Sequence, residues 1–387
     1  MDITRATPLL GGLSPQTFMR RHWQKKPLLV RQAVPGGIEL VGRRQLFELA
    51  GFDEVESRLI VRDGARWSLR HGPLKRAALP PLKQRAWTLL VQGLDLHVPA
   101  ARDLLDRFRF VPDARLDDVM LSYASDGGGV GPHVDSYDVF LLQAQGRRRW
   151  RIGRARAPEL VADVPLKILA NFEAEHEWLL DPGDMLYLPP GWGHDGIAEG
   201  ECTTCSIGFR APGRAEVGRE VLQRLLDDAD DEAAGPLYRD PAQPATDAPG
   251  MIPAALTAFA ADAVARLLAD PSALARALGE VLSEPKRGVW FDAAQAADPA
   301  ESRGVALDQR TRMIYDARHV YINGESFRAA GRDAALMHRL ADRRALDRGQ
   351  TRALSGEARA LLADWLACGW LRYDDTDQRG DDEGDRR

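Results

Sequence analysis

The chain has 387 residues and a formal net charge of −5, with 44% hydrophobic and 28% charged residues. This composition is ordinary for a soluble globular protein, and the length suggests two or three domains that each bury a core. It excludes wholesale disorder, and the sequence has no apolar stretch near the roughly 20 residues that span a bilayer.

Three further features of the sequence narrow the cellular compartment and the class of partner. They are the cysteine usage, the N-terminal sequence and the charge balance. The three cysteines, Cys202, Cys205 and Cys368, exclude a disulfide scaffold and favour a reducing cytoplasm. The N-terminal residues carry mixed charges without an apolar run, so no secretory signal is expected. A mildly acidic chain is not typical of a general nucleic-acid binder, although this balance leaves a local basic face open.

The first half of the chain predicts short helices and then many strands. Ser14 followed by Pro15 is typical of a helix N-terminus, and a second helix is expected over 43–50. From about residue 57 to 209, short β-rich runs alternate with Gly/Pro turns, which favours a sandwich or barrel over βαβ units. One helix is expected near 100–108. The expected strands are 58–62, 87–92, 119–124, 134–142, 148–152, 185–188 and 203–209.

The second half predicts two further modules and a tail. Residues 214–283 are helical in pattern, with a Pro/Asp/Ala-rich break near 235–253. From about residue 305, strand-like runs, an Asn323-Gly324 turn, two amphipathic helices and a closing strand fit a winged-helix-like module. The expected fold class is therefore α+β, with domains at 1–212 (strand-rich), 213–300 (helical), 301–373 (winged-helix-like) and an acidic, solvated tail at 374–387.

The first candidate for a chemical site is the tripeptide His133-Val134-Asp135. Residues i and i+2 of a strand lie on one face, so the imidazole and the carboxylate can converge on one ion. The tripeptide alone is a weak signal, because about one His-x-acid match is expected by chance in such a chain. Taken in isolation, it is better explained as part of a polar surface strand.

The surrounding sequence reverses this interpretation. A Gly-rich turn over 126–132 would deliver the strand to the mouth of a barrel. Tyr137, Val139 and Leu141 would continue the same face as a mostly apolar interior. His194 then arrives where a short apolar strand ends in a Pro/Gly loop.

These residues predict a metal centre with His133, Asp135 and His194 as its ligands and catalytic core. Two histidines and one carboxylate leave three adjacent coordination positions open. This arrangement is typical of non-haem Fe(II) sites, which admit O2 and a cosubstrate together. Zinc sites prefer more nitrogen and sulfur ligands and leave one open position, so iron is the better prediction.

Longer motifs extend this pattern over most of the chain. The segment 127–150, with Gly-Pro-His-Val-Asp-Ser-Tyr-Asp-Val-Phe inside it, resembles the JmjC/cupin-type ribosomal oxygenases, as do 187–194, 208–212 and 23–28. More narrowly, the chain resembles the bacterial arginine 3-hydroxylases of ribosomal protein L-sixteen. The resemblance implies a double-stranded β-helix (the cupin or JmjC jelly roll), then a helical dimerisation domain and a winged-helix-like domain.

The resemblance also implies Fe(II), 2-oxoglutarate and O2 as reactants. Arg148 matches the family position for the cation that binds the far carboxylate of 2-oxoglutarate, and a guanidinium can bind a carboxylate through two hydrogen bonds. A solvated basic turn is the alternative for the run 147–149, although strand alternation lets one arginine point inward. Ser122 matches a residue that hydrogen-bonds the cosubstrate, and a core serine bonded to the backbone explains it equally well.

The predicted function is therefore a 2-oxoglutarate-dependent dioxygenase that hydroxylates the Cβ of an arginine in large-subunit ribosomal protein L-sixteen, as a cytoplasmic homodimer. The acidic chain is compatible with a basic ribosomal partner, because complementary charge speeds encounter. One alternative is another cupin enzyme, either a lysine demethylase or a dioxygenase that uses no 2-oxoglutarate, which would not need Arg148. The other is a ligand-sensing, DNA-binding regulator. The helix expected over 355–365 offers few basic residues to a major groove, so direct DNA binding is not expected.

Overall fold

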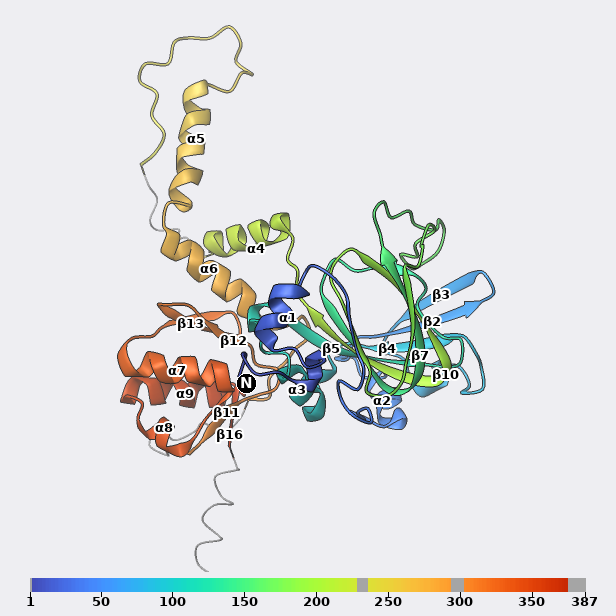
Figure 1. Ribbon diagram of the computed structural model, residues 1–387. Helices are drawn as coiled ribbons and strands as arrows, with labels where there is room; N and C mark the ends of the chain where they lie inside the picture. The colour runs from blue at the N-terminus through green and yellow to red at the C-terminus, as the bar shows by residue number, and fades with distance from the viewer. Residues whose placement is uncertain (1, 228–235, 294–302, 375–387) are drawn as a thin grey trace, which may run out of the picture. The chain divides into compact units, whose positions relative to one another are not determined.

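The computed structural model describes residues 2–227, 236–293 and 303–374, and the chain divides after Ala211 into two compact units (Figure 1). Each unit is described by itself. Within the described residues, every helix is too short or too polar to cross a membrane. Residues 375–387 of the expected acidic tail lie outside the described residues, and the expected boundaries at 212 and 300 stay predictions.

A ten-stranded antiparallel sheet forms the wall of the first unit and curves into a barrel (Figure 1). Its strand order is β1-β9-β7-β10-β5-β4-β2-β3, while β6 pairs with β10 and β8 with β7. The absence of βαβ units from this sheet confirms the predicted barrel. The strands are β1 (Leu28–Val30), β2 (Ser57–Asp63), β3 (Arg66–His71), β4 (Trp87–Val91), β5 (Leu116–Ala124), β6 (His133–Val134), β7 (Val139–Arg154), β8 (His176–Leu180), β9 (Met185–Leu188) and β10 (Trp192–Phe209).

Three α-helices of the first unit lie where the sequence predicts them: α1 (Pro15–Arg21), α2 (Arg43–Leu49) and α3 (Pro99–Asp106). The Ser14 hydroxyl accepts a hydrogen bond from the backbone N–H of Thr17, and Pro15 occupies the first turn. Phe18, Leu46 and Leu104 bury their side chains in the largest hydrophobic cluster of the unit. These helices therefore cover a core and leave the barrel interior free.

The longest pairing in the sheet joins β7 to β10 and positions the candidate site. Its register runs from Val139 opposite Gly208 to Arg154 opposite Trp192, with an irregularity between Glu199 and Thr204. Two of the separately predicted strands are thus parts of longer ones, 148–152 of β7 and 203–209 of β10.

The predicted strand over 134–142 is wrong in its middle, because β6 ends at Val134 and β7 begins at Val139. Asp138 is fully buried and accepts hydrogen bonds from the Tyr187 hydroxyl (2.6 Å) and the Gln24 amide (3.0 Å). These contacts come from distant parts of the chain, so a strand pattern cannot reveal them. They anchor the end of the loop between β6 and β7 to β9 and to the segment after α1, while the Asp138 carbonyl accepts from the Phe209 N–H of β10.

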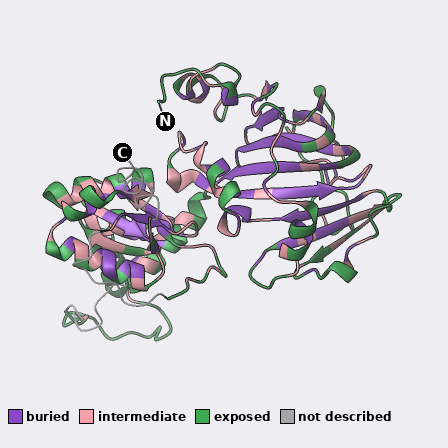
Figure 2. Cartoon of the chain, turned by 90° about the horizontal axis from the view of Figure 1, so that it is seen from below, coloured by how far each residue is buried: buried purple, intermediate pink, exposed green. Residues whose placement is uncertain are grey.

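The second unit begins with three helices, α4 (Arg214–Asp227), α5 (Ala254–Leu267) and α6 (Pro271–Ser283), as the helical pattern predicts. Val221 and Leu225 of α4 pack with Ala277 of α6. On α6, a Cβ at Gly279 would lie 2.3 Å from the ring of Tyr321, so glycine permits close packing of α6 on β13. Figure 2 shows buried residues (purple) running along the strands of the first unit's sheet, whereas the connecting loops are mostly exposed (green).

The rest of the second unit confirms the winged-helix-like prediction. The Asn323-Gly324 turn joins β13 to β14, and a core that includes Leu340, Leu362 and Trp365 fills the space between the helices and the strands. The sequence pattern did not reveal four elements of this unit: β11, β14, β15 and α8. The elements are β11 (Val305–Leu307), β12 (Met313–Tyr315), β13 (His319–Ile322), β14 (Glu325–Arg328), α7 (Gly331–Arg343), β15 (Ala345–Leu346), α8 (Arg348–Arg352), α9 (Gly356–Ala367) and β16 (Leu371–Tyr373).

Candidate active site

A cavity of about 510 Å³ lies in the first unit and is lined by residues of β2 to β7 and β10. This volume is within the range of small-molecule sites. Its wall is partly apolar, through Val139, Leu141 and Trp150, as the sequence predicts for the first two of these residues. All five predicted site residues, which come from four separate segments of the chain, line this one cavity: Ser122, His133, Asp135, Arg148 and His194.

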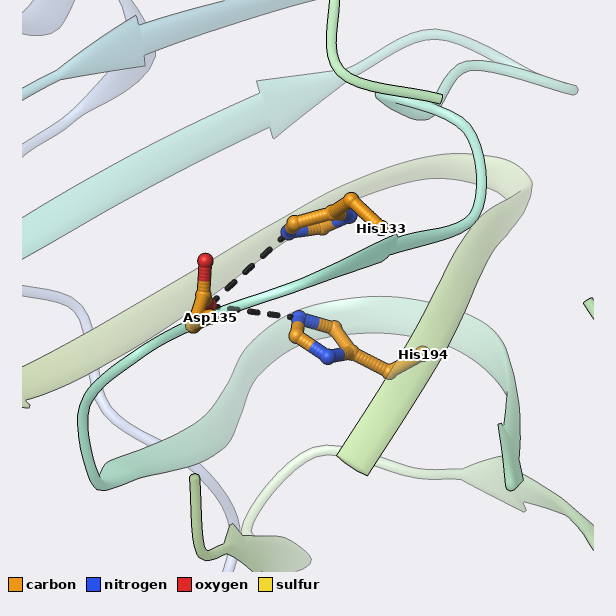
Figure 3. Close-up of side chains that lie close together, drawn as sticks. All are labelled: His133, Asp135 and His194. Carbon is orange, nitrogen blue, oxygen red and sulfur yellow. Dashed lines mark ion pairs between the residues drawn. The ribbon is translucent and has the colours of Figure 1, made fainter. Parts of the chain in front are cut away.

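His133, Asp135 and His194 form a compact cluster whose ligand-type atoms all lie within 4.8 Å of one another. An Asp135 oxygen lies 3.9 Å from Nε2 of His133 and 3.6 Å from Nε2 of His194 (Figure 3). β6 and β10 pair so that His133 stands directly opposite His194. Asp135 follows one residue after β6 and turns its carboxylate toward both rings.

Backbone carbonyls orient both imidazole rings. Nδ1 of His133 lies 3.0 Å from the Gly131 carbonyl, and Nδ1 of His194 lies 3.2 Å from the Trp192 carbonyl. A carbonyl only accepts hydrogen bonds, so each Nδ1 carries the proton and each Nε2 presents a lone pair toward Asp135. This is the orientation that metal-binding histidines usually have.

Burial of His194, followed by the proximity of His133, lowers the pKa of His194 to about 4, although Asp135 opposes the shift. The ring is therefore neutral at pH 7, which is the form that binds a metal ion. The histidine is also well fixed, because its side chain is only 3% exposed. Two imidazoles and one carboxylate fit a divalent first-row metal ion such as Fe(II).

The Gly-rich run before His133 lets the backbone approach β10 closely. A Cβ at Gly129 would lie 2.5 Å from the Gly196 carbonyl oxygen, and one at Gly128 would lie 2.4 Å from the Trp87 carbonyl oxygen. Both distances are far below ordinary van der Waals contact. Glycine at these two positions therefore allows the loop to lie against β10, which carries His194, and against the start of β4.

Arg148 is a buried cation with incomplete hydrogen bonding. Its residue surface is 5% exposed, and Nη1 donates to the Ser122 hydroxyl at 3.0 Å. Nε and Nη2 are also buried, and neither has a hydrogen-bond partner in the described part of the chain. A buried, partly unpaired guanidinium is costly. This observation indicates that an anionic ligand completes its bonding, and a carboxylate suits its geometry.

The arginines on either side of Arg148 point away from the cavity. Arg147 is exposed, and Arg149 forms ion pairs with Glu177 and Glu199. Strand alternation therefore places one arginine of the three inside, as predicted. Ser122 lines the cavity, where its hydroxyl accepts a hydrogen bond from Arg148. The same hydroxyl also donates to the Thr204 backbone carbonyl at 3.4 Å, as expected for a core serine.

The sequence analysis missed several polar residues that line the same cavity. Asp118, Met120 and Ser122 follow one another at i, i+2 and i+4 along β5 and all reach it. Asp118 is buried and accepts a hydrogen bond from the Gly93 backbone N–H. The period-two spacing before Ser122 was the signal that could have identified this acid.

Comparisons with known proteins agree with this geometry. The JmjC domain family matches residues 103–217, and the ROXA-like winged helix family matches 266–372. The chain is 40% identical to the ribosomal protein uL16 3-hydroxylase of Escherichia coli K12 over 233 residues, which covers 59% of this chain and 60% of the hydroxylase's length.

Solved structures of YcfD from E. coli are similar over nearly the whole chain. One superposes with a TM-score of 0.82 and 30% identity, covering 93% of this chain and 98% of YcfD. Another, of YcfD as a ribosomal oxygenase in complex with cobalt and 2-oxoglutarate, superposes with a TM-score of 0.80 and 29% identity, covering 94% and 98%.

The curved antiparallel barrel with its His/Asp/His cluster defines a JmjC protein of the cupin fold. The winged helix and the full-length likeness to YcfD narrow the class further. The chain belongs to the ribosomal oxygenase family.

Proposed function

We propose that the protein is an Fe(II)- and 2-oxoglutarate-dependent oxygenase that hydroxylates the Cβ of an arginine in ribosomal protein uL16, the L-sixteen protein of the large subunit. The observation that carries the proposal is the buried, partly unpaired Arg148 in the same cavity as the His/Asp/His cluster. A metal site alone fits many cupin enzymes. A metal site with an internal cation fits an anionic cosubstrate such as 2-oxoglutarate.

Each part of the cavity has an assigned task in this proposal. His133, Asp135 and His194 would hold Fe(II), which, when bound with 2-oxoglutarate and O2, supplies oxidative decarboxylation to succinate and transfer of one oxygen atom to the substrate carbon. Arg148 would bind the far carboxylate of the cosubstrate, with Ser122 fixing the guanidinium from the other side. The apolar residues of the wall exclude water from the reacting groups.

The remaining polar wall supports a cationic side chain as substrate. Asp117 and Asp118 on β5 line the cavity, and carboxylates there complement a guanidinium. Tyr137 also lines it, and burial followed by the nearby Asp135 raises the pKa of the Tyr137 phenol. The phenol therefore stays protonated at pH 7 and offers a neutral, partly apolar surface to the alkyl part of an arginine.

The function is tested by measuring conversion of 2-oxoglutarate to succinate by the full chain with Fe(II), with and without purified uL16. We expect uL16 to raise turnover several-fold above the slow reaction without substrate, since the true substrate positions the target carbon at the metal. An equally basic ribosomal protein serves as the control. Equal stimulation by both proteins, or by neither, would rule out uL16 as the specific substrate.

The helical segment of the second unit supports a homodimer. Leu222 and Leu226 on α4 are 45% and 54% exposed, and Leu274 on α6, which packs against α4, is 43% exposed. Apolar side chains gathered on neighbouring helices are typical of a partner surface. The variant Leu222→Glu/Leu226→Glu should run as a monomer in light scattering, whereas Arg219→Glu on the same helix should not change the mass.

The second unit does not resemble a reader of DNA. The exposed side chains of α9 include Glu357, Ala360 and Asp364, none of which suits a major groove. We therefore propose that this unit serves assembly and substrate access, and that the enzyme works in the cytoplasm, where ribosomal proteins are made.

A further inference from the structure

Positive charge is concentrated on the β2–β3 hairpin and the segment after it. Between residues 57 and 86, eight residues are Lys or Arg and only Asp63 is acidic, although the whole chain carries a net charge of −5. Two of the eight, Arg58 and Arg62, are partly buried. We call the six exposed ones the basic surface: Arg66, Arg70, Lys75, Arg76, Lys83 and Arg85.

The fold brings members of the basic surface together. Arg66 and Arg70 lie four residues apart on β3 and so share one face of the hairpin. Nη1 of Arg70 donates to the Ala78 carbonyl at 3.1 Å, which joins β3 to the turn that carries Lys75 and Arg76. Arg66, Arg70, Lys75 and Arg76 therefore lie on adjoining segments of the chain.

Most of these cations have no internal counter-charge. Arg85 pairs with Asp126 at 2.8 Å, whereas the other five form no ion pair with a carboxylate of the described residues. One solvated surface arginine needs no explanation, but several neighbouring unpaired cations repel one another and create a positive field. An anionic partner would relieve this repulsion.

A groove beside the basic surface adds apolar and aromatic area. It has a volume of about 800 Å³ and is lined by Lys75, Arg76, Phe47 and Phe52, among others. Phe52 is 50% exposed, and the Arg76 guanidinium lies over the Phe47 ring at 5.3 Å. Cations interleaved with an exposed aromatic ring are typical of surfaces that bind nucleic-acid backbones and stack bases.

The basic surface also adjoins the active site. Arg58 and Ile60 of β2 and Leu69 of β3 line the cavity that holds the His/Asp/His cluster. Arg66 and Arg70 lie on the opposite face of β3 from Leu69, so a partner bound to them would lie on the outer side of the wall that encloses the cavity. The proposed substrate is itself a basic ribosomal protein, which this surface would repel, so the surface requires a different and anionic partner.

We propose that the basic surface binds the phosphate backbone of RNA, so that the enzyme engages its substrate together with RNA. The first part rests on the charges, exposure and groove described above. The second part rests on the proposed function, because RNA is the anionic companion of a ribosomal protein.

The test measures the binding of a fluorescein-labelled single-stranded RNA of about 20 nucleotides, longer than the roughly 4–16 nucleotides of a single-strand site, to the full chain by fluorescence anisotropy at several salt concentrations. Each phosphate contact contributes about 0.7 to the slope of log affinity against log salt. The variant Arg66→Glu/Arg70→Glu/Lys75→Glu should bind at least about tenfold more weakly and lose about 2 from that slope. Arg20→Glu/Arg21→Glu, an exposed pair on α1, is the matched control and should bind like the parent protein.

Three outcomes would overturn the proposal: no RNA binding by the parent protein, equal losses in the two variants, or displacement of the RNA by polyglutamate at equal charge concentration. Unchanged circular dichroism and unchanged 2-oxoglutarate turnover without substrate show that the triple variant is folded. RNA binding needs no catalysis. Failure of uL16 hydroxylation with intact RNA binding would therefore refute the proposed function alone, and the reverse result would refute this inference alone.

Discussion

Two buried charged residues, one in each unit, are bonded differently. In the second unit, the Glu280 carboxylate accepts from the Ser326 hydroxyl, and the nearby Ser283 accepts from the Gly324 N–H. In the first unit, Arg148 is buried with two nitrogens that lack partners in the described chain. The comparison separates a buried charge that stabilises its own unit from one that is left to bind a ligand.

This contrast also explains why the chemistry lies in a barrel. An unpaired buried charge destabilises a protein, so the surrounding fold must stabilise it. The first unit supplies a large apolar cluster, which includes Phe18, Trp87 and Phe140, on the side of the sheet away from the cavity. The cavity can then keep charged residues close together without loss of the fold.

The largest expected effect follows from removing a predicted metal ligand. Asp135→Ala should abolish 2-oxoglutarate turnover, with a loss greater than the roughly 10- to 100-fold that removal of a group supporting a ligand costs. Thermal unfolding should change little, since Asp135 lies in a loop and packs no core. Asp103→Ala, an exposed acid on α3, is the control. Retained turnover in Asp135→Ala would show that the His/Asp/His cluster is not the metal site, so the first unit could no longer be assigned the chemistry.

The next largest effect concerns the cation in the cavity. Arg148→Ala should raise the KM for 2-oxoglutarate at least about a hundredfold, because leaving one partner of a buried ion pair alone costs about 3–5 kcal/mol. Arg147→Ala, which alters the exposed neighbour, should leave KM unchanged. Steady-state kinetics of both variants measure these KM values. Similar KM values for the two variants would mean that a residue other than Arg148 binds the far carboxylate of 2-oxoglutarate.

A smaller effect is expected from changing the shape of the cavity wall. A Cβ at Gly196 would lie 2.6 Å from the Trp150 ring, so Gly196→Ala should destabilise the protein by about 1–3 kcal/mol through overpacking. Denaturant unfolding measures this loss. Gly218→Ala on α4, where a Cβ would meet nothing within 4 Å, should be neutral or slightly stabilising. Trp150→Phe in the Gly196→Ala background should recover part of the stability, and no recovery would mean that the two residues do not clash.

The smallest expected effects come from replacing two buried serines, one in each unit. Ser122→Ala should raise the KM for 2-oxoglutarate about five- to tenfold, because losing one typical hydrogen bond, here the one to Arg148, costs about 1–1.5 kcal/mol. Ser283→Ala should lower the unfolding free energy by about 1 kcal/mol and leave KM unchanged. An unchanged KM together with a lower unfolding free energy for Ser122→Ala would show that Ser122 serves only the stability of the first unit.

Much of this molecule follows from the sequence. Spacing alone suggests that His133 and Asp135 share a side, and alternation allows Arg148 to point inward. The long motifs then connect these residues with His194. The winged-helix-like module follows from its Asn-Gly turn and amphipathic helices.

The missed features have physical causes. The loop between β6 and β7 depends on hydrogen bonds to Asp138 from residues far away in sequence. β3 carries exposed Arg66 and Arg70 on one face and has no fully buried residue on the other, so it lacks the apolar alternation of a strand. Asp118 is an acid on a buried face of β5, where a pattern of hydrophobicity predicts an apolar residue.

The most direct test of the central claim is the intact mass of every ribosomal protein from cells that express this chain and from cells that express its Asp135→Ala variant. We expect one protein, uL16, to be heavier by one oxygen atom in the first set, with the extra oxygen on an arginine side chain by fragmentation. Identical masses in both sets, or an oxygen added to another protein, would contradict the account.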